Sequence, residues 1–156
     1  MTTPTGDAGI YARESTYLGR FVQFGEVGDR IISVSFPTRP ESDSSGDHSL
    51  LDRIEAYLGG AEDDFDDVTV GLTVPTDHRK VLEAVDRIPY GEEGSVEQVV
   101  MMTQGLGSDE QEDQKRVREA LAANPVPLLI PDHRVRDGPS GTPPEVERKL
   151  RSVEGL

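Results

Sequence analysis

The residues best suited to chemistry in this sequence are an adjacent carboxylate and imidazole, Asp132 and His133, which directly follow Pro131. An aspartate is ionised at neutral pH, so it needs no base to activate it. Carboxylate nucleophiles do exist, and the pair could form a covalent intermediate at Asp132. The alternative is structural, with Asp132 capping the turn after Pro131 and His133 hydrogen-bonding locally.

Metal chemistry has weaker support. A metal site built from Asp132, His133 and a distant His48 or His78 has no recognisable ligand spacing. The acidic run 62–67 lacks the central glycine and terminal glutamate of a calcium-binding EF-hand loop. The chain contains no cysteine, which excludes disulfides, thiolate metal sites and cysteine nucleophiles. The sequence therefore predicts neither a metal nor a cofactor.

The charge balance is strongly acidic. Thirty Asp and Glu residues face sixteen Lys and Arg residues, for a net charge of −14. Acidic residues spread over every segment hold water and salt cations, which favours a protein adapted to a salt-rich cytoplasm. A cationic partner is the alternative interpretation. No signal segment and no apolar run of membrane-spanning length are present, so we expect a cytoplasmic protein that does not enter a membrane.

The first half of the chain is rich in strand patterns. Two strands are predicted at 18–27 and 30–36, joined by a hairpin turn at Gly28-Asp29. The spacing of Leu50, Leu51 and Ile54 predicts a helix over 49–58, and alternation predicts a third strand over 68–74. Residues 1–14 are small and polar and are expected to form a flexible tail.

The second half, from residue 75, is helical. Helices are predicted over 77–87, from Ser95 to residue 102, and after Ser108, with a last helix starting at Pro143-Pro144. The run 126–130 is expected to be extended. Three short helices with tight turns also describe a helix-turn-helix DNA module. Residues 114–136 form the one clearly cationic stretch, although local salt bridges could equally account for its bases.

Two motifs carry a resemblance to a known family. Residues 124–135 read Asn-Pro-Val-Pro-Leu-Leu-Ile-Pro-Asp-His-Arg-Val. This run resembles the active-site signature of the methylated-DNA–protein-cysteine methyltransferases, in which it ends Pro-Cys-His-Arg-Val. The segment 88–92, Ile-Pro-Tyr-Gly-Glu, followed by Ser95, is similar to a second motif of the same family. The resemblance covers residues 75–156 well and residues 15–74 in outline.

The resemblance implies an α+β fold. A small antiparallel sheet-and-helix lobe over 15–74 would be followed by a helical lobe over 75–156 with a winged helix-turn-helix. In the family this second lobe binds double-stranded DNA in the minor groove and flips out a 6-O-alkylguanine. A cysteine thiolate then accepts the alkyl group once. The resemblance therefore implies DNA containing alkylated guanine as the partner, with repair proteins as further partners and a monomeric state.

Carried over position by position, the resemblance breaks at the reacting residue. Asp132 stands in place of the acceptor cysteine, while His133 and Asn124 match the family's site histidine and asparagine. Val96 replaces a tyrosine that helps to rotate the target nucleotide, and Ser140 lies in a short lesion-binding loop. The family's carboxyl-terminal glutamate falls at Leu156, with Glu154 close by. The DNA-binding residues implied are Ser95, Lys115 (in place of an intercalating arginine), Arg116, Arg118 and Arg136.

Three functions follow from this pattern. The first is a non-enzymatic protein that binds alkylguanine lesions, as the cysteine-less alkyltransferase-like proteins do. The second is genuine alkyl transfer to Asp132, although a carboxylate is a harder and weaker nucleophile than a thiolate. The third is a retained fold that serves as an interaction protein without binding DNA.

Overall fold

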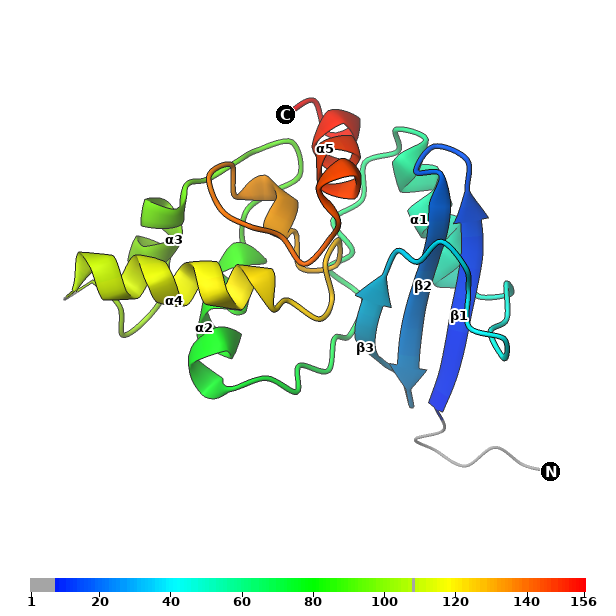
Figure 1. Ribbon diagram of the computed structural model, residues 1–156, viewed down its shortest axis with the longest axis horizontal. Coiled ribbons are helices and arrows are strands. Elements are labelled where there is room, and N and C mark those ends of the chain that lie inside the picture. The colour runs from blue at the N-terminus through cyan, green and yellow to red at the C-terminus, as the bar shows by residue number, and fades with distance from the viewer. Residues whose placement is uncertain (1–7, 108) are drawn as a thin grey trace.

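The computed structural model describes residues 8–107 and 109–156 of the chain. Its elements are, in order, β1 (Ala8–Ser15), β2 (Arg20–Val27), β3 (Arg30–Ser35), α1 (Ser49–Leu58), α2 (Thr76–Val85), α3 (Val96–Met102), α4 (Glu110–Ala122), a 3₁₀ turn (Asp132–Arg134) and α5 (Pro144–Val153). The sheet and α1 lie at one end of the molecule and α2, α3 and α4 at the other, with α5 and the 3₁₀ turn between them (Figure 1).

The sheet is an antiparallel meander in the order β1-β2-β3. The predicted hairpin at Gly28-Asp29 is confirmed, since β2 and β3 pair on either side of it and Gly28 adopts a positive φ of 64°. The expected tail over 1–14 is wrong for residues 8–14, because Ala8–Ser15 pairs along its whole length with β2. Cross-strand pairing outweighs the small, polar composition that suggested a tail. Residues 1–7 lie outside the described part of the chain.

The predicted strand over 68–74 is also wrong. Residue Val70 forms only an isolated bridge with Ile31 at the edge of β3. Farther along β3 the backbone N–H of Val34 donates to Pro125 O at 2.8 Å, so the connection from α4 occupies the edge that a longer strand would need. The run 126–130 is likewise a turn rather than an extended segment, with Leu128 at a φ of 78°.

The predicted helices are confirmed, with small shifts at their ends. The helix at 49–58 has the expected bounds, and Ser95 caps α3 through a capping box with Gln98. Helix α4 is capped by the Asp109 side chain, whereas Ser108, the predicted first residue, lies outside the described residues. The last helix, α5, begins with Pro144 at its first position.

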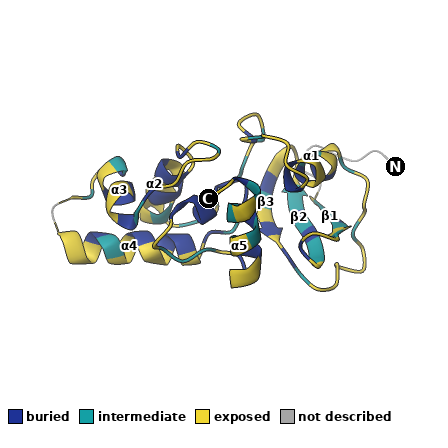
Figure 2. Ribbon diagram, turned by 90° about the horizontal axis from the view of Figure 1, so that it is seen from above, coloured by how far each residue is buried: buried dark blue, intermediate teal, exposed yellow. Residues whose placement is uncertain are grey.

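The buried apolar side chains of the sheet, α1 and the helical end form one continuous cluster. Leu51 and Ile54 of α1 pack against the sheet, and Leu82 and Leu121 join α2 to α4. The outer face of α4 remains exposed (Figure 2). The residues between α4 and α5 are almost fully buried from Val126 to Val135, so the Asp132-His133 pair sits in the interior. No helix in the described residues is long and apolar enough to cross a membrane.

Candidate functional site

The turn that carries the site is held by the side chain of Asn124, which follows the end of α4. Its Oδ1 accepts from the Val126 N–H at 3.0 Å, while its Nδ2 donates to Ile130 O at 3.1 Å and to Asp132 Oδ2 at 3.0 Å. One amide side chain thus bridges both ends of the turn. Asn124 therefore lies beside Asp132, as the sequence predicted, and its side chain stabilises the turn.

The carboxylate of Asp132 is fully buried and accepts hydrogen bonds on both oxygens. Ser140 Oγ donates to Oδ1 at 2.6 Å, and the Gly141 N–H and Asn124 Nδ2 donate to Oδ2 at 2.8 and 3.0 Å. Burial raises the pKa of Asp132 above its ordinary value, although the hydrogen bonds from Gly141, Ser140 and Asn124 oppose this. Asp132 therefore ties the 137–142 loop to the turn and is unreachable from solvent in this conformation.

The neighbouring His133 belongs to a separate buried network centred on Glu154. The Glu154 carboxylate accepts from His133 Nε2 at 2.6 Å, from Arg134 Nε at 2.8 Å and from the Gly91 N–H at 3.0 Å. The hydroxyl of Tyr57, on α1, also donates to Glu154. Burial disfavours the charged form of Glu154, but the hydrogen bonds from His133 and Arg134 outweigh it and lower its pKa to about 2.

This network includes residues that the sequence did not identify. Arg134, packed beside Tyr90, also donates to Ile88 O at 2.6 Å, which ties the Ile-Pro-Tyr-Gly motif to the Pro-Asp-His-Arg motif. Tyr57 had no sequence signal, because its partner Glu154 lies 97 positions away. Near the carboxyl end, where the resemblance pointed to Leu156 with Glu154 close by, it is Glu154, two residues earlier, that contacts His133 and Arg134.

One atom of His133 stands apart from this network. Its Nδ1 is the one buried side-chain nitrogen or oxygen without a hydrogen-bond partner within residues 8–107 and 109–156. Because Nε2 faces the Glu154 carboxylate, the ring carries a proton on Nε2 and offers Nδ1 as an acceptor when neutral. Such a buried acceptor is suited to bind a water molecule.

The loop between the 3₁₀ turn and α5 covers the site. The Asp137 carboxylate accepts from the Val96 N–H at 2.7 Å, which fixes the loop to the first residue of α3. A Cβ at Gly138 would lie 2.7 Å from a methyl of Leu121, and one at Gly141 would lie 2.5 Å from Asn124 O. The loop is thus packed tightly on α4. Both residues predicted for a lesion pocket, Val96 and Ser140, contact this loop or belong to it.

The basic residues predicted to bind DNA lie elsewhere, on the surface. Lys115, Arg116 and Arg118 are exposed on α4, and Arg136 is exposed on the loop. Two of them form only long ion pairs within the helix, Lys115 with Glu119 at 4.0 Å and Arg116 with Glu112 at 3.8 Å. An open hollow of about 670 Å³ joins this face of α4 to Pro139; it is lined by Gln111, Gln114, Lys115, Arg118, Glu119, Ala122 and Pro139. Ser95 acts as the cap of α3.

No group of three or more His, Asp or Glu side chains in the described part of the chain is arranged to hold a metal ion. His48 caps α1 and contacts Glu26 at 3.2 Å. The acidic run 62–67 is closed by Arg53, which binds both Asp63 and Asp67. The guanidinium of Arg53, on α1, thus pairs with the carboxylates that would otherwise be available to a calcium ion.

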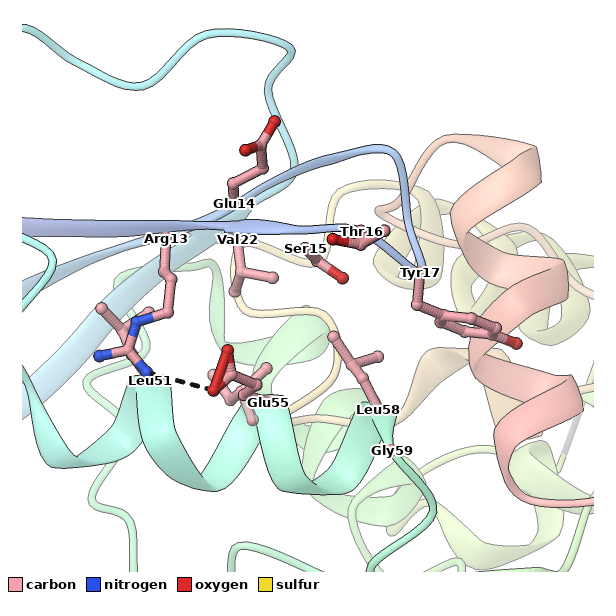
Figure 3. A pocket seen from close by; sticks show the side chains of 11 residues that line it. Arg13, Glu14, Ser15, Thr16, Tyr17, Val22, Leu51, Glu55, Leu58 and Gly59 are labelled. Carbon is pink, nitrogen blue, oxygen red and sulfur yellow. Dashed lines mark ion pairs between the residues drawn. The ribbon is translucent and has the colours of Figure 1, made fainter.

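A second cavity, of about 240 Å³, lies between α1 and the ends of β1 and β2 (Figure 3). Its floor is apolar, formed by side chains such as Leu51 and Leu58, and Arg13 at its rim faces Glu55 at 3.8 Å. Arg13 is also bound to Asp52 at 2.7 Å, so its charge is neutralised. None of the predicted site residues lines this cavity.

Comparisons with known proteins agree with the family that the sequence motifs indicated. Residues 77–153 match the family described as 6-O-methylguanine DNA methyltransferase, DNA binding domain. A methylated-DNA–protein-cysteine methyltransferase of Methanopyrus kandleri is 37% identical over 110 residues, covering 69% of this chain and 78% of that protein. One of Metallosphaera sedula is 28% identical over 152 residues, covering 92% and 93%.

Solved structures share the whole fold. A variant of the Mycobacterium tuberculosis O6-methylguanine methyltransferase superposes with a TM-score of 0.75 at 20% identity, covering 95% of this chain and 93% of that one. The M. tuberculosis OGT in complex with DNA gives a TM-score of 0.73 at 21% identity, covering 94% and 92%. The three-stranded sheet and the five α-helices of the described residues therefore have the arrangement found in those enzymes.

Proposed function

This chain belongs to the methylated-DNA–protein-cysteine methyltransferase family, and we propose that it acts in DNA repair as a protein that binds alkylated guanine in double-stranded DNA without accepting the alkyl group on cysteine. The observation that carries the proposal is the buried carboxylate of Asp132, which is held by Asn124, Ser140 and Gly141 and stands where the sequence resemblance puts the acceptor cysteine. The chain offers no cysteine anywhere else.

Alkyl transfer to Asp132 is the less favoured function. A nucleophile must direct a free lone pair at the alkyl carbon from about 3–3.5 Å. Both oxygens of Asp132 already accept hydrogen bonds, which reduces their reactivity, and a carboxylate is a weaker nucleophile than a thiolate. The contacts support the structural role considered for Asp132 from the sequence, in which it closes the turn after Pro131.

We assign DNA binding to α2, α3 and α4 as a winged helix-turn-helix, with α4 as the recognition helix. Its exposed bases Lys115, Arg116 and Arg118, together with Arg136 on the loop, would contact phosphate. The hollow on this face of α4 extends to Pro139, which belongs to the loop over Asp132. A base rotated out of the duplex would enter beneath this loop, between Val96 and Ser140.

The net charge of −14 opposes binding to the negatively charged DNA backbone. Phosphate contacts weaken steeply as salt rises, so in a salt-rich cytoplasm recognition would depend on stacking and shape more than on charge. We propose that the protein acts there as a monomer and passes the lesion to other repair proteins.

A direct test compares duplexes with and without one O6-methylguanine by fluorescence anisotropy across a range of KCl concentrations. We expect tighter binding to the modified duplex. Equal and negligible binding to both would instead indicate an interaction protein that does not bind DNA. Intact-protein mass spectrometry after incubation with the modified duplex tests the second function, because a gain of one CH₂ on the Asp132 peptide would show alkyl transfer to the carboxylate.

Replacing Asp132 with Cys provides a complementary test. The Asp132→Cys variant places a thiol next in sequence to His133, the residue that the resemblance assigns to thiolate activation and whose Nε2 contacts Glu154 at 2.6 Å. We expect partial recovery of methyl transfer. A folded Asp132→Cys variant that binds the lesion but takes up no methyl group would show that the acceptor position has been assigned to the wrong residue.

A further inference from the structure

The three donors that hold Asp132 are not equivalent. Asn124 Nδ2 belongs to the turn that carries Asp132, whereas Ser140 Oγ and the Gly141 N–H belong to the covering loop. Any group that enters between Asp132 and the loop must displace the two loop donors. The carboxylate would then lose part of its hydrogen bonding while it stays buried.

An ionised carboxylate only accepts hydrogen bonds, and a buried acceptor left without donors is strongly unfavourable. A group that takes the place of Ser140 and Gly141 is therefore bound well only when it brings an N–H or O–H of its own. This requirement restricts which base can occupy the site.

The resemblance puts Asp132 where the family's cysteine takes the alkyl group, so the substituent at position 6 of an extrahelical purine would face its carboxylate. In O6-alkylguanine the substituent is an ether oxygen without hydrogen, and it meets the carboxylate with like polarity. In an adenine-type purine the corresponding exocyclic nitrogen carries an N–H donor.

The underside of the loop is packed closely against apolar side chains. A Cβ at Gly138 would lie only 2.7 Å from Leu121, 3.2 Å from Val96 and 3.3 Å from Val135, so a base enters here only when the loop moves away from α4. An alkyl group on the exocyclic nitrogen then meets these apolar side chains.

We propose that Asp132 is a specificity-determining residue that selects extrahelical purines carrying an alkylated amino group at position 6 over those carrying an alkoxy group. The carboxylate accepts the N–H of the substituent in place of the loop donors. This inference rests on the proposed function, since the base must leave the duplex and enter beneath the loop. It changes the preferred ligand from 6-O-alkylguanine to a 6-alkylaminopurine.

The test uses three duplexes, two of which differ only in the group attached at position 6 of one purine. One carries 2-amino-6-methoxypurine, which is O6-methylguanine, and the other carries 2-amino-6-methylaminopurine, each opposite thymine. A third duplex is unmodified. We expect the wild-type protein to bind the methylamino duplex about tenfold more tightly than the methoxy duplex, as for one hydrogen bond to a charged group.

Two variants identify the carboxylate as the cause. In Asp132→Asn the amide can donate to the ether oxygen, so the preference should fall below about threefold. In Ser140→Ala a loop donor is lost but the carboxylate remains, so the preference should persist. Circular dichroism of both variants verifies that they are folded.

The outcomes separate this inference from the proposed function. If wild-type protein binds both modified duplexes equally, and both more tightly than the unmodified one, lesion binding stands and selection by Asp132 is wrong. A preference that survives in Asp132→Asn would equally overturn the role of the carboxylate. If neither modified duplex is bound more tightly than the unmodified one, both proposals fail.

Discussion

The substitution of Glu154 by Gln tests the central feature of the buried network. This change preserves the shape of the side chain and removes its charge. In the wild-type protein the Glu154 side chain is fully buried, with Arg134 Nε at 2.8 Å and His133 Nε2 at 2.6 Å. The Gln side chain cannot neutralise Arg134, so a buried guanidinium would remain without a counter-ion.

Two independent arguments give a similar value for the free energy of unfolding that Glu154→Gln should lose. Breaking a buried ion pair by removing one partner costs about 3–5 kcal/mol. The pKa of Glu154 is about 2 in the folded protein, against 4.5 for an ordinary glutamate, and this difference is worth about 3 kcal/mol at neutral pH. The pKa is lowered by folding, so this stabilisation is fully present above about pH 4.5 and is lost as the pH falls towards 2. About 2 kcal/mol of it should disappear between pH 7 and pH 3.

Urea unfolding at pH 7 and pH 3, in a fixed concentration of KCl, measures both effects. Glu154→Gln should lower the free energy of unfolding by about 3 kcal/mol at pH 7 and by much less at pH 3. The matched control is Glu145→Gln in the first turn of α5, the helix that Glu154 directly follows; there the side chain is 64% exposed and its ion pair with Arg20 is 3.4 Å long. The control should cost less than about 1 kcal/mol. Equal losses in the two variants, or an unchanged acid dependence in Glu154→Gln, would refute the reasoning.

Three further outcomes are expected. Tyr57→Phe removes a hydroxyl that donates to Glu154 and should lower the free energy of unfolding by about 1.5–3 kcal/mol, measured by urea unfolding. Gly141→Ala places a methyl group against Asn124 O and should lower the free energy of unfolding by about 1–3 kcal/mol. In the wild-type protein the amide of residue 141 donates to Asp132, and its hydrogen exchange should be faster in the variant. Arg118→Ala should weaken binding to modified and plain duplexes alike and reduce the slope of log Kd against log[KCl] by about 1.

The first two of these predictions have matched controls. Tyr17→Phe removes the hydroxyl of an exposed tyrosine, which donates to Lys149 O at 3.1 Å, and should change stability little. Gly46→Ala adds a Cβ at an ordinary 3.5 Å from Ala12 O, so it should be tolerated. A Gly141→Ala variant as stable as the wild type would mean that the loop is not packed against the turn. A salt slope unchanged in Arg118→Ala would exclude this residue from the DNA contact.

Much of the secondary structure could be predicted from local sequence. The α1 helix, the Gly28-Asp29 hairpin and the Ser95 cap depend on residues within a few positions of one another, and each was confirmed. The errors came where pairing partners lie far apart. Strand β1 forms because β2 pairs with it, and the segment around Val70 fails to form a strand because Pro125 occupies the edge of β3. Neither fact is encoded in the segment itself.

The sequence by itself determined the family, the absence of cysteine and the identity of the residues at the site, because these are properties of residue type and order. It left open whether Asp132 is a reactive group or a structural one. Only the tertiary structure decided its surroundings, because Asn124, Ser140 and Gly141 become its donors when α4 and the loop come together. The same holds for Glu154, whose charge is stabilised by Arg134 and by Tyr57 on α1, since burial and partners shift a pKa and both arise only from the packing of distant segments.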